Sequence, residues 1–177
     1  WKIPDAKKMA KITYSEEDTW DTDIKEKFVF EPGGSNFEAD TNFMLNTHCL
    51  FSFFDGMLRT PYEISITHPA DFYGTCSLTD VTYKGNMDTY HVPDYYQLQD
   101  APMMYDVPDT TILNVGGAQI IISLYSPNKI TTSKFLAKKI NEILVAQKEY
   151  LGGSLPIKKY AYLIYLTATT GGSGASG

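Results

Sequence analysis

The clearest periodicity in the chain lies between residues 133 and 150, where apolar residues recur at three- and four-residue spacing and charged residues fill the gaps. The apolar positions are Leu136, Ile140, Ile143, Leu144 and Leu151. This spacing places them on one side of an α-helix. Thr132 and Ser133 supply hydroxyls for the first turn, and Gly152-Gly153 can adopt the left-handed backbone that ends a helix. The pattern predicts an amphipathic helix with both ends marked.

An apolar run rich in aromatic residues extends from Tyr160 to Thr167, and residues 169–177 are then almost entirely Gly, Ser, Thr and Ala. The run lacks the polar alternation of a half-exposed strand, so we expect a strand that is covered on both faces and has a neighbour for its backbone groups. It is predicted to join the sheet of the preceding domain or to pair between molecules, which is self-association through an exposed strand. The helix over 133–150 is expected to pack against it.

Shorter segments upstream have the character of strands. Tyr62 to Thr67 alternates between apolar and polar residues and ends at His68-Pro69, which is typical of a half-buried strand. Gly116-Gly117 separates two apolar segments, 111–115 and 118–125, and this spacing predicts a two-residue hairpin. Further strands are predicted at 11–14, 28–30, 72–78 and 81–83.

Two segments follow no simple period. Residues 42–58 hold the densest apolar group in the chain, and we interpret them as a helix whose face is core, with an aromatic substrate groove as the alternative. Residues 90–108 contain Pro93, Pro102 and Pro108, which forbid long regular elements. The mixture of acids, amides and aromatic residues in this second segment suits the wall of a binding site.

These elements predict a mainly β fold, with an antiparallel β-sandwich-like domain followed by one amphipathic helix and one strand. We place the domain boundary between about residues 125 and 132, so that residues 1–128 form the first domain and residues 129–177 belong to the second. Thirteen tyrosines, nine phenylalanines and 43% hydrophobic residues in a chain of 177 suit a buried β core.

The charge pattern argues against several partners. The net charge is -6 and no basic cluster interrupts it, so we do not expect the chain to bind nucleic acid. No apolar run is long enough to cross a bilayer, so membrane insertion is not expected either. The acidic segment from Glu16 to Asp23 lacks the residue spacing of a calcium loop and is interpreted as a solvated loop.

Residues that carry enzyme chemistry are sparse. The histidines are His48, His68 and His91, and none belongs to a His-x-x-x-His pair on a predicted helix, so this chain is not expected to hold zinc. Cys49 and Cys76 are interpreted as buried thiols rather than as a disulfide or a catalytic nucleophile. No Gly-x-Ser-x-Gly motif occurs, so a serine hydrolase site is not predicted.

A succession of motifs resembles one family of peptidases. The motifs are Thr19-Trp20-Asp21-Thr22, Phe30-Glu31-Pro32-Gly33-Gly34, Gln99-Asp100-Ala101-Pro102-Met103-Met104, Pro108-Asp109-Thr110-Thr111, Ala146 to Gly153, Leu155-Pro156 and Tyr160 to Ile164. The first four resemble the amino-terminal β-domain of the glycyl aminopeptidase family of zinc metallopeptidases, metallopeptidase family sixty-one. The others resemble the start of its catalytic domain. None is specific alone, and their collinear order over nearly the whole chain carries the resemblance.

The resemblance implies most of an amino-terminal β-domain, incomplete at its start, followed by the first helix, strand and glycine-rich loop of a truncated catalytic domain. In that family a His-Glu-x-x-His helix follows such a loop. Zinc and a peptide substrate are therefore expected in the parent protein, with no cofactor in this chain, and the partner would be the missing catalytic domain. The family includes many exported proteins, which favours the cell envelope or secretion.

The resemblance also implies candidate site residues. A comparable Asp-x-Pro segment in related aminopeptidases lies on the face of the β-domain turned towards the catalytic domain. Gln99, Asp100 and Tyr105 are therefore candidates for lining the peptide-binding cleft, although Asp100 could instead cap a turn before Pro102. The implied function is that of a non-catalytic amino-terminal fragment of a zinc-dependent aminopeptidase. The alternative is an independent extracytoplasmic β-sandwich module that binds peptide or glycan.

Overall fold

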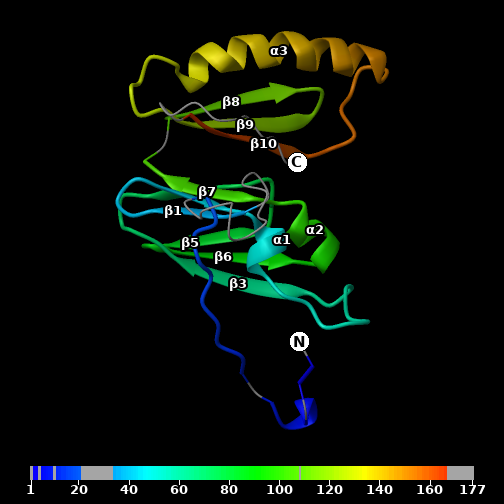
Figure 1. The fold of residues 1–177 in the computed structure, drawn as a ribbon. Helices are drawn as coiled ribbons and strands as arrows, with labels where there is room; N and C mark the ends of the chain where they lie inside the picture. The colour runs from blue at the N-terminus through cyan, green and yellow to red at the C-terminus, as the bar shows by residue number, and fades with distance from the viewer. Residues whose placement is uncertain (1, 4, 10, 21–33, 108, 167–177) are drawn as a thin grey trace.

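The computed structural model describes residues 2–3, 5–9, 11–20, 34–107 and 109–166. Its fold is mainly β, as predicted, and within these residues it consists of stacked layers: three sheets and one long helix on top (Figure 1). The predicted strand at 28–30, the acidic residues Asp21 and Asp23, and the glycine-rich segment 169–177 lie outside the described residues.

Two antiparallel sheets form the lower part of the molecule, with strand orders β1-β2-β7-β4 and β3-β6-β5. The strands are β1 (Asn36–Glu38), β2 (Asn42–Leu45), β3 (Tyr62–Thr67), β4 (Tyr73–Thr75), β5 (Val81–Lys84), β6 (Met87–Val92) and β7 (Met103–Asp106). We call this unit the sandwich. The strands predicted at 62–67, 72–78 and 81–83 are confirmed.

The core of the sandwich lies between its two sheets, because strand alternation turns every second side chain inward. Ile64, Tyr90 and Val92 of one sheet meet Leu45, Met103 and Tyr105 of the other. Two short helices, α1 (Thr47–Leu50) and α2 (Tyr95–Gln99), close one end. Tyr95 and Leu98 of α2 belong to the same apolar cluster. The helix that precedes β7 is therefore anchored in the core.

A third sheet, with strand order β10-β9-β8, lies above the four-stranded sheet (Figure 1). β8 (Asp109–Val115) and β9 (Ala118–Tyr125) form the predicted hairpin, with φ of 56° at Gly116 and 86° at Gly117. β10 (Lys159–Tyr165) pairs with β9 in parallel. Parallel neighbours need a crossover connection, and α3 (Ser133–Tyr150) provides it. We call β8, β9, α3 and β10 the helix-covered unit.

Both predictions for the end of the chain are confirmed in outline. The Thr132 hydroxyl accepts from Phe135 N at 3.2 Å, and Gly152 and Gly153 have φ of 85° and 104°. The predicted strand adds to a sheet of the same molecule by pairing with β9. α3 lies over β8 and β9, and Tyr162 and Ile164 of β10 reach the cluster beneath it. The other edge of β10 has no strand partner among the described residues.

The predicted domain boundary near residues 125–132 stays a prediction. The β8–β9 hairpin, which that prediction placed in the first domain, shares a sheet with β10 and is covered by α3. Val115, Ile120 and Ile122 of the hairpin form one apolar cluster with Ala137 and Leu144 of α3. The helix-covered unit therefore has a core of its own, separate from that of the sandwich.

Three local predictions are wrong. Residues 11–14 form no strand: Ile12 and Tyr14 are exposed, and the Tyr14 hydroxyl donates to Leu50 O at 2.8 Å. Residues 42–58 are not one helix, because Phe43 and Leu45 alternate inward as strand β2 and α1 spans only one turn. Cys49 is exposed rather than buried, whereas Cys76 is buried as predicted.

The segment 90–108 is more regular than predicted. It contains the end of β6, the helix α2 and the fully buried strand β7, which lies between β2 and β4. β7 is a short strand close after Pro102, so it shows no period of its own in the sequence. Its place is fixed by pairing with β2 and β4, which lie far away in the sequence. Local sequence patterns do not encode such pairing.

Candidate functional site

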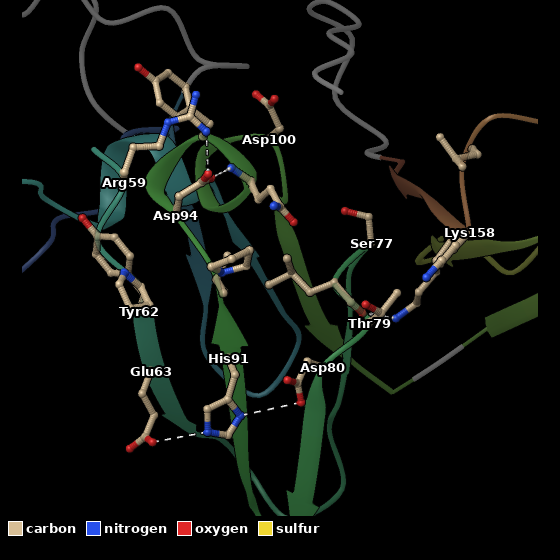
Figure 2. Close-up of a pocket in the computed structure, with 18 residues that line it drawn as sticks. Arg59, Tyr62, Glu63, Ser77, Thr79, Asp80, His91, Asp94, Asp100 and Lys158 are labelled. Atoms are coloured by element: carbon tan, nitrogen blue, oxygen red, sulfur yellow. Dashed lines mark hydrogen bonds and ion pairs between the residues drawn. The ribbon is translucent and has the colours of Figure 1, made fainter. Parts of the chain in front are cut away.

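A cleft of about 1030 Å³ lies between the sandwich and the segment that leads into β10. One wall carries residues of β3, β6 and α2 together with residues 77–80, and the other carries Ile157, Lys158 and Lys159 (Figure 2). Clefts between packed units are frequent ligand sites. We call it the inter-unit cleft and treat it as the candidate site.

Two lysines at the start of β10, Lys158 directly before it and Lys159 as its first residue, line the wall opposite the sandwich. The Lys159 ammonium donates to Leu78 O at 2.6 Å, which ties the two units together at this point. Lys158 is exposed and lies across from Ser77 and Thr79 (Figure 2). Gln119 N of β9 donates to Lys158 O at 2.9 Å and fixes the backbone there. The cleft therefore has a positively charged side.

The end of α2 forms a rigid corner of the cleft. Asp94 caps this helix by accepting from Gln97 N at 3.0 Å, and its other carboxylate oxygen accepts from Arg59 Nη1 at 3.1 Å. The Arg59 guanidinium also lies 4.8 Å from the centre of the Tyr96 ring, a cation–π contact. Asp94 and Arg59 neutralise each other at this corner.

An imidazole lies between two carboxylates on the face of the β3-β6-β5 sheet. His91 Nε2 is 3.3 Å from Glu63 Oε2, and His91 Nδ1 is 3.7 Å from Asp80 Oδ1 (Figure 2). Glu63 stands opposite His91 in the strand register, which explains the pairing. These are ion pairs when the imidazole is protonated. Among the described residues, no group of three or more His, Cys, Asp or Glu is arranged to hold a metal ion.

The structure separates the three site residues predicted from the sequence. Asp100 lines the cleft, is exposed and follows the last turn of α2 as its C-cap residue. Gln99 is half-buried and is not a lining residue; its backbone carbonyl accepts from the Thr47 hydroxyl at 3.4 Å. Tyr105 is 1% exposed in the sandwich core, away from the cleft. The role of each in peptide binding stays a prediction.

Tyr105 belongs to a buried polar group instead. Its hydroxyl donates to Asp88 Oδ2 at 3.1 Å and is hydrogen-bonded to the Tyr90 hydroxyl at 2.7 Å. His68 Nε2 lies 3.4 Å from the other oxygen of Asp88. Burial raises the pKa of Tyr90 and of Tyr105 far above the usual range, because the phenolates would be poorly solvated. Both hydroxyls therefore stay protonated.

Sequence reasoning missed most of the cleft. Arg59, His91, Asp94 and Lys158 gave no motif, because they come from separate elements that only the folded chain brings together. A weak signal was available at Lys158-Lys159, a pair of charges directly before an apolar strand. The cleft offers charged and hydrogen-bonding groups for binding a polar ligand, with no activated nucleophile among them.

Residues 1–106 match the peptidase M61 N-terminal domain. The chain belongs to the peptidase M61 family. The match ends at the last residue of β7, so it covers the sandwich and stops before the helix-covered unit. No curated protein sequence matches the chain significantly. Within the described residues, no helix is long and apolar enough to cross a membrane.

Solved structures share the fold. The crystal structure of an aminopeptidase N family protein from Idiomarina loihiensis superposes with a TM-score of 0.67 at 13% sequence identity. The alignment covers 78% of this peptidase M61 family chain and 24% of that protein. The chain thus spans about a quarter of the length of that aminopeptidase N family protein, and at this identity the likeness concerns the fold alone.

Proposed function

We propose that this chain is the amino-terminal part of a zinc-dependent aminopeptidase, that it packs against the catalytic domain of the same protein, and that it forms part of the wall of the peptide-binding cleft. The observation that carries the proposal is the placement of Asp100 in the inter-unit cleft of a chain that belongs to the peptidase M61 family. Asp100 comes from the sandwich, and Lys158, directly before β10, lines the opposite wall of the same cleft.

Two surfaces of the helix-covered unit support packing against further protein. The outer edge of β10 has no strand partner among the described residues, and open edges readily accept another strand. The outward face of α3 carries Ile143 and Tyr150, which are 59% and 91% exposed and line a shallow apolar groove with Ala146. Apolar surface of this kind is typical of an interface.

Charges in the cleft support binding of a peptide. Asp100 and Lys158 make no ion pair with another described residue, whereas the other acids of the cleft are paired with Arg59 or His91. An unpaired carboxylate suits the amino end of a peptide, and an unpaired ammonium suits a carboxylate or a backbone carbonyl. Glycine preference at the amino end is part of the proposal that the family resemblance suggests.

Zinc belongs to the remainder of the parent protein in this proposal. The described residues do not fit a zinc site, because no group of suitable ligands is brought together. In this proposal the role of the chain is to hold and orient a peptide. No chemical step is assigned to its residues.

The test uses the full-length parent protein and an aminopeptidase assay. Asp100→Asn should raise KM about tenfold, equivalent to about 1.4 kcal/mol of binding, with kcat little changed. Asp71→Asn is the matched control, since Asp71 is exposed and does not line the cleft. A full-length protein that lacks bound zinc and releases no amino acids would overturn the proposal. Peptide binding by such an inactive protein would favour the independent binding module.

A further inference from the structure

The layer between the sandwich and the helix-covered unit contains buried polar groups. Alternation on β2 and β7 turns Phe43, Leu45, Met103 and Tyr105 into the sandwich core. The opposite face of the same strands carries Asn42, Met104 and Asp106, each with 0% exposure. Tyr125 and Tyr165 of the helix-covered unit lie above them, close to Glu38 of β1. We call Glu38, Asn42, Asp106, Tyr125 and Tyr165 the polar junction.

Asp106 is a fully buried carboxyl group that lies beside the amide of Asn42, its register partner on β2. The two side chains do not reach ordinary hydrogen-bond geometry, so this contact is a poorly aligned one. Burial raises the pKa of Asp106 to about 7, the contact with the Asn42 amide opposes this shift, and Asp109 adds to it. The indole nitrogen of Trp20, beside Tyr165, is a further buried atom without a partner.

Among the residues that the structure describes, no cation faces Asp106. Its neighbours are Asn42 on β2, Tyr73 on β4, Asp109 on β8 and Tyr125 on β9. These are an amide, two phenols and one acid. An ionised Asp106 would therefore be a buried charge without a described cation beside it, repelled by Asp109, and it would be better solvated if the two units moved apart.

We propose that the polar junction is a pH-dependent hinge, closed when Asp106 is protonated and opened when Asp106 is ionised. The position of Asp106 suits this role, because β7 ends at Asp106 and β8 of the other unit begins at Asp109. Opening would break contacts that include the hydrogen bond from the Tyr165 hydroxyl to Glu38, the edge contact between Trp20 and Tyr165 at 5.3 Å, and the Lys159 bond to Leu78 O at 2.6 Å.

Opening of the hinge changes the inter-unit cleft, because the same two units form its walls. Proton linkage gives the direction: the closed form binds one proton more than the open form, so the open fraction rises with pH. It rises about tenfold per pH unit up to about pH 7 and levels off above that. The inference goes beyond the proposed function and does not depend on it, since it is measured on this chain without substrate.

The test follows the solvent access of Trp20 in a Trp1→Phe background, where Trp20 is the remaining tryptophan. Acrylamide quenching of its fluorescence should increase from about pH 5 to about pH 7 and then level off. In the same background Asp106→Asn, which stays neutral, should abolish this dependence. His91→Gln is the control, because His91 is exposed and outside the junction, and it should leave the dependence intact.

Two results would overturn the inference. One is quenching that is independent of pH in the Trp1→Phe protein. The other is an unchanged pH dependence in folded Asp106→Asn. If Asp106→Asn does not fold, infrared spectroscopy of the Trp1→Phe protein decides: the carbonyl band of a protonated carboxylic acid should be present at about pH 6 and lost by about pH 8. Absence of this band at about pH 6 would show that Asp106 is not protonated there and would contradict the proposed hinge.

Discussion

At the scale of single residues, Gly74 is the glycine of the sandwich at which an added Cβ atom would meet the closest contacts. A Cβ atom there would lie 2.7 Å from Cζ of Tyr105, 2.7 Å from the Tyr90 hydroxyl and 2.8 Å from Asp88 Oδ2. These are the groups that share the buried hydrogen bonds of the core. The absence of a side chain at this position in β4 is what allows that polar group to be satisfied inside an apolar cluster.

Gly74→Ala should lower the free energy of unfolding by about 2–4 kcal/mol, through overpacking and the loss of a buried hydrogen bond. Urea denaturation measures this. Gly56→Ala is the control: nothing lies within 4 Å of its added Cβ, so only the backbone strain at φ +75° remains, a cost of about 1 kcal/mol. Equal losses for the two variants would show that the close contacts at Gly74 do not restrict it.

Asp106 should make the stability of the chain depend on pH. Its pKa is about 7 in the folded state and 3.8 in the reference state, so the folded protein holds an extra proton between these values. The free energy of unfolding should therefore fall as the pH rises through this window, by about 1.4 kcal/mol per unit at most, and level off above it. The difference between wild type and Asp106→Asn, measured by urea denaturation from about pH 4 to about pH 8, isolates this group. A constant difference would contradict the prediction.

At this scale, the sequence does not predict which side chains from separate elements come together. Asp100 was placed in a cleft by its family resemblance, whereas His91 meets Glu63 only through the β3–β6 register and Asp80 only through the loop before β5. Tyr105 was a candidate cleft residue because its segment mixes acids, amides and aromatic residues, yet strand alternation turns it inward. Its burial depends on β7 being a strand, which the sequence did not reveal.

At the scale of elements, long or sharply bounded segments were predictable. α3 has an apolar period and marked ends, and the β8–β9 hairpin has Gly116-Gly117 at its turn, so local chemistry determines both. β2 and β7 were missed because short central strands depend on partners far away in sequence. The parallel alignment of β10 with β9 was also not predicted, since either edge of a sheet could have received that strand.

Ile164→Lys tests the docking of β10. Ile164 is partly buried and packs against the cluster beneath α3, so an unpaired charge that disrupts this packing should cost about 2–4 kcal/mol of unfolding free energy. Ile143→Lys is the matched control, because Ile143 is 59% exposed on the outer face of α3, and its effect should stay within about 0.5 kcal/mol. Sedimentation of both variants also tests the prediction of self-association through the edge of β10. An unchanged stability of Ile164→Lys would show that β10 is not docked.

At the scale of the whole molecule, the family membership sets an expectation for this chain by itself. The residues that hold and activate a zinc-bound water are expected elsewhere in the parent protein. We therefore expect that the purified chain retains no stoichiometric zinc after dialysis and releases no amino acids from peptides. Metal analysis and an aminopeptidase assay check this. One tightly bound zinc per chain would contradict the division of roles proposed above.

The two separate apolar cores have a consequence for heating. The layer between the two cores couples their unfolding only weakly. Contacts across this layer contribute less free energy than the apolar contacts inside each core. Each core would then melt as its own cooperative block, and a single two-state transition would not describe the chain. In a scanning calorimeter, the total heat absorbed should exceed the van't Hoff enthalpy derived from the shape of the peak. The gap between the two should widen at alkaline pH, where the charge on Asp106 further uncouples the blocks.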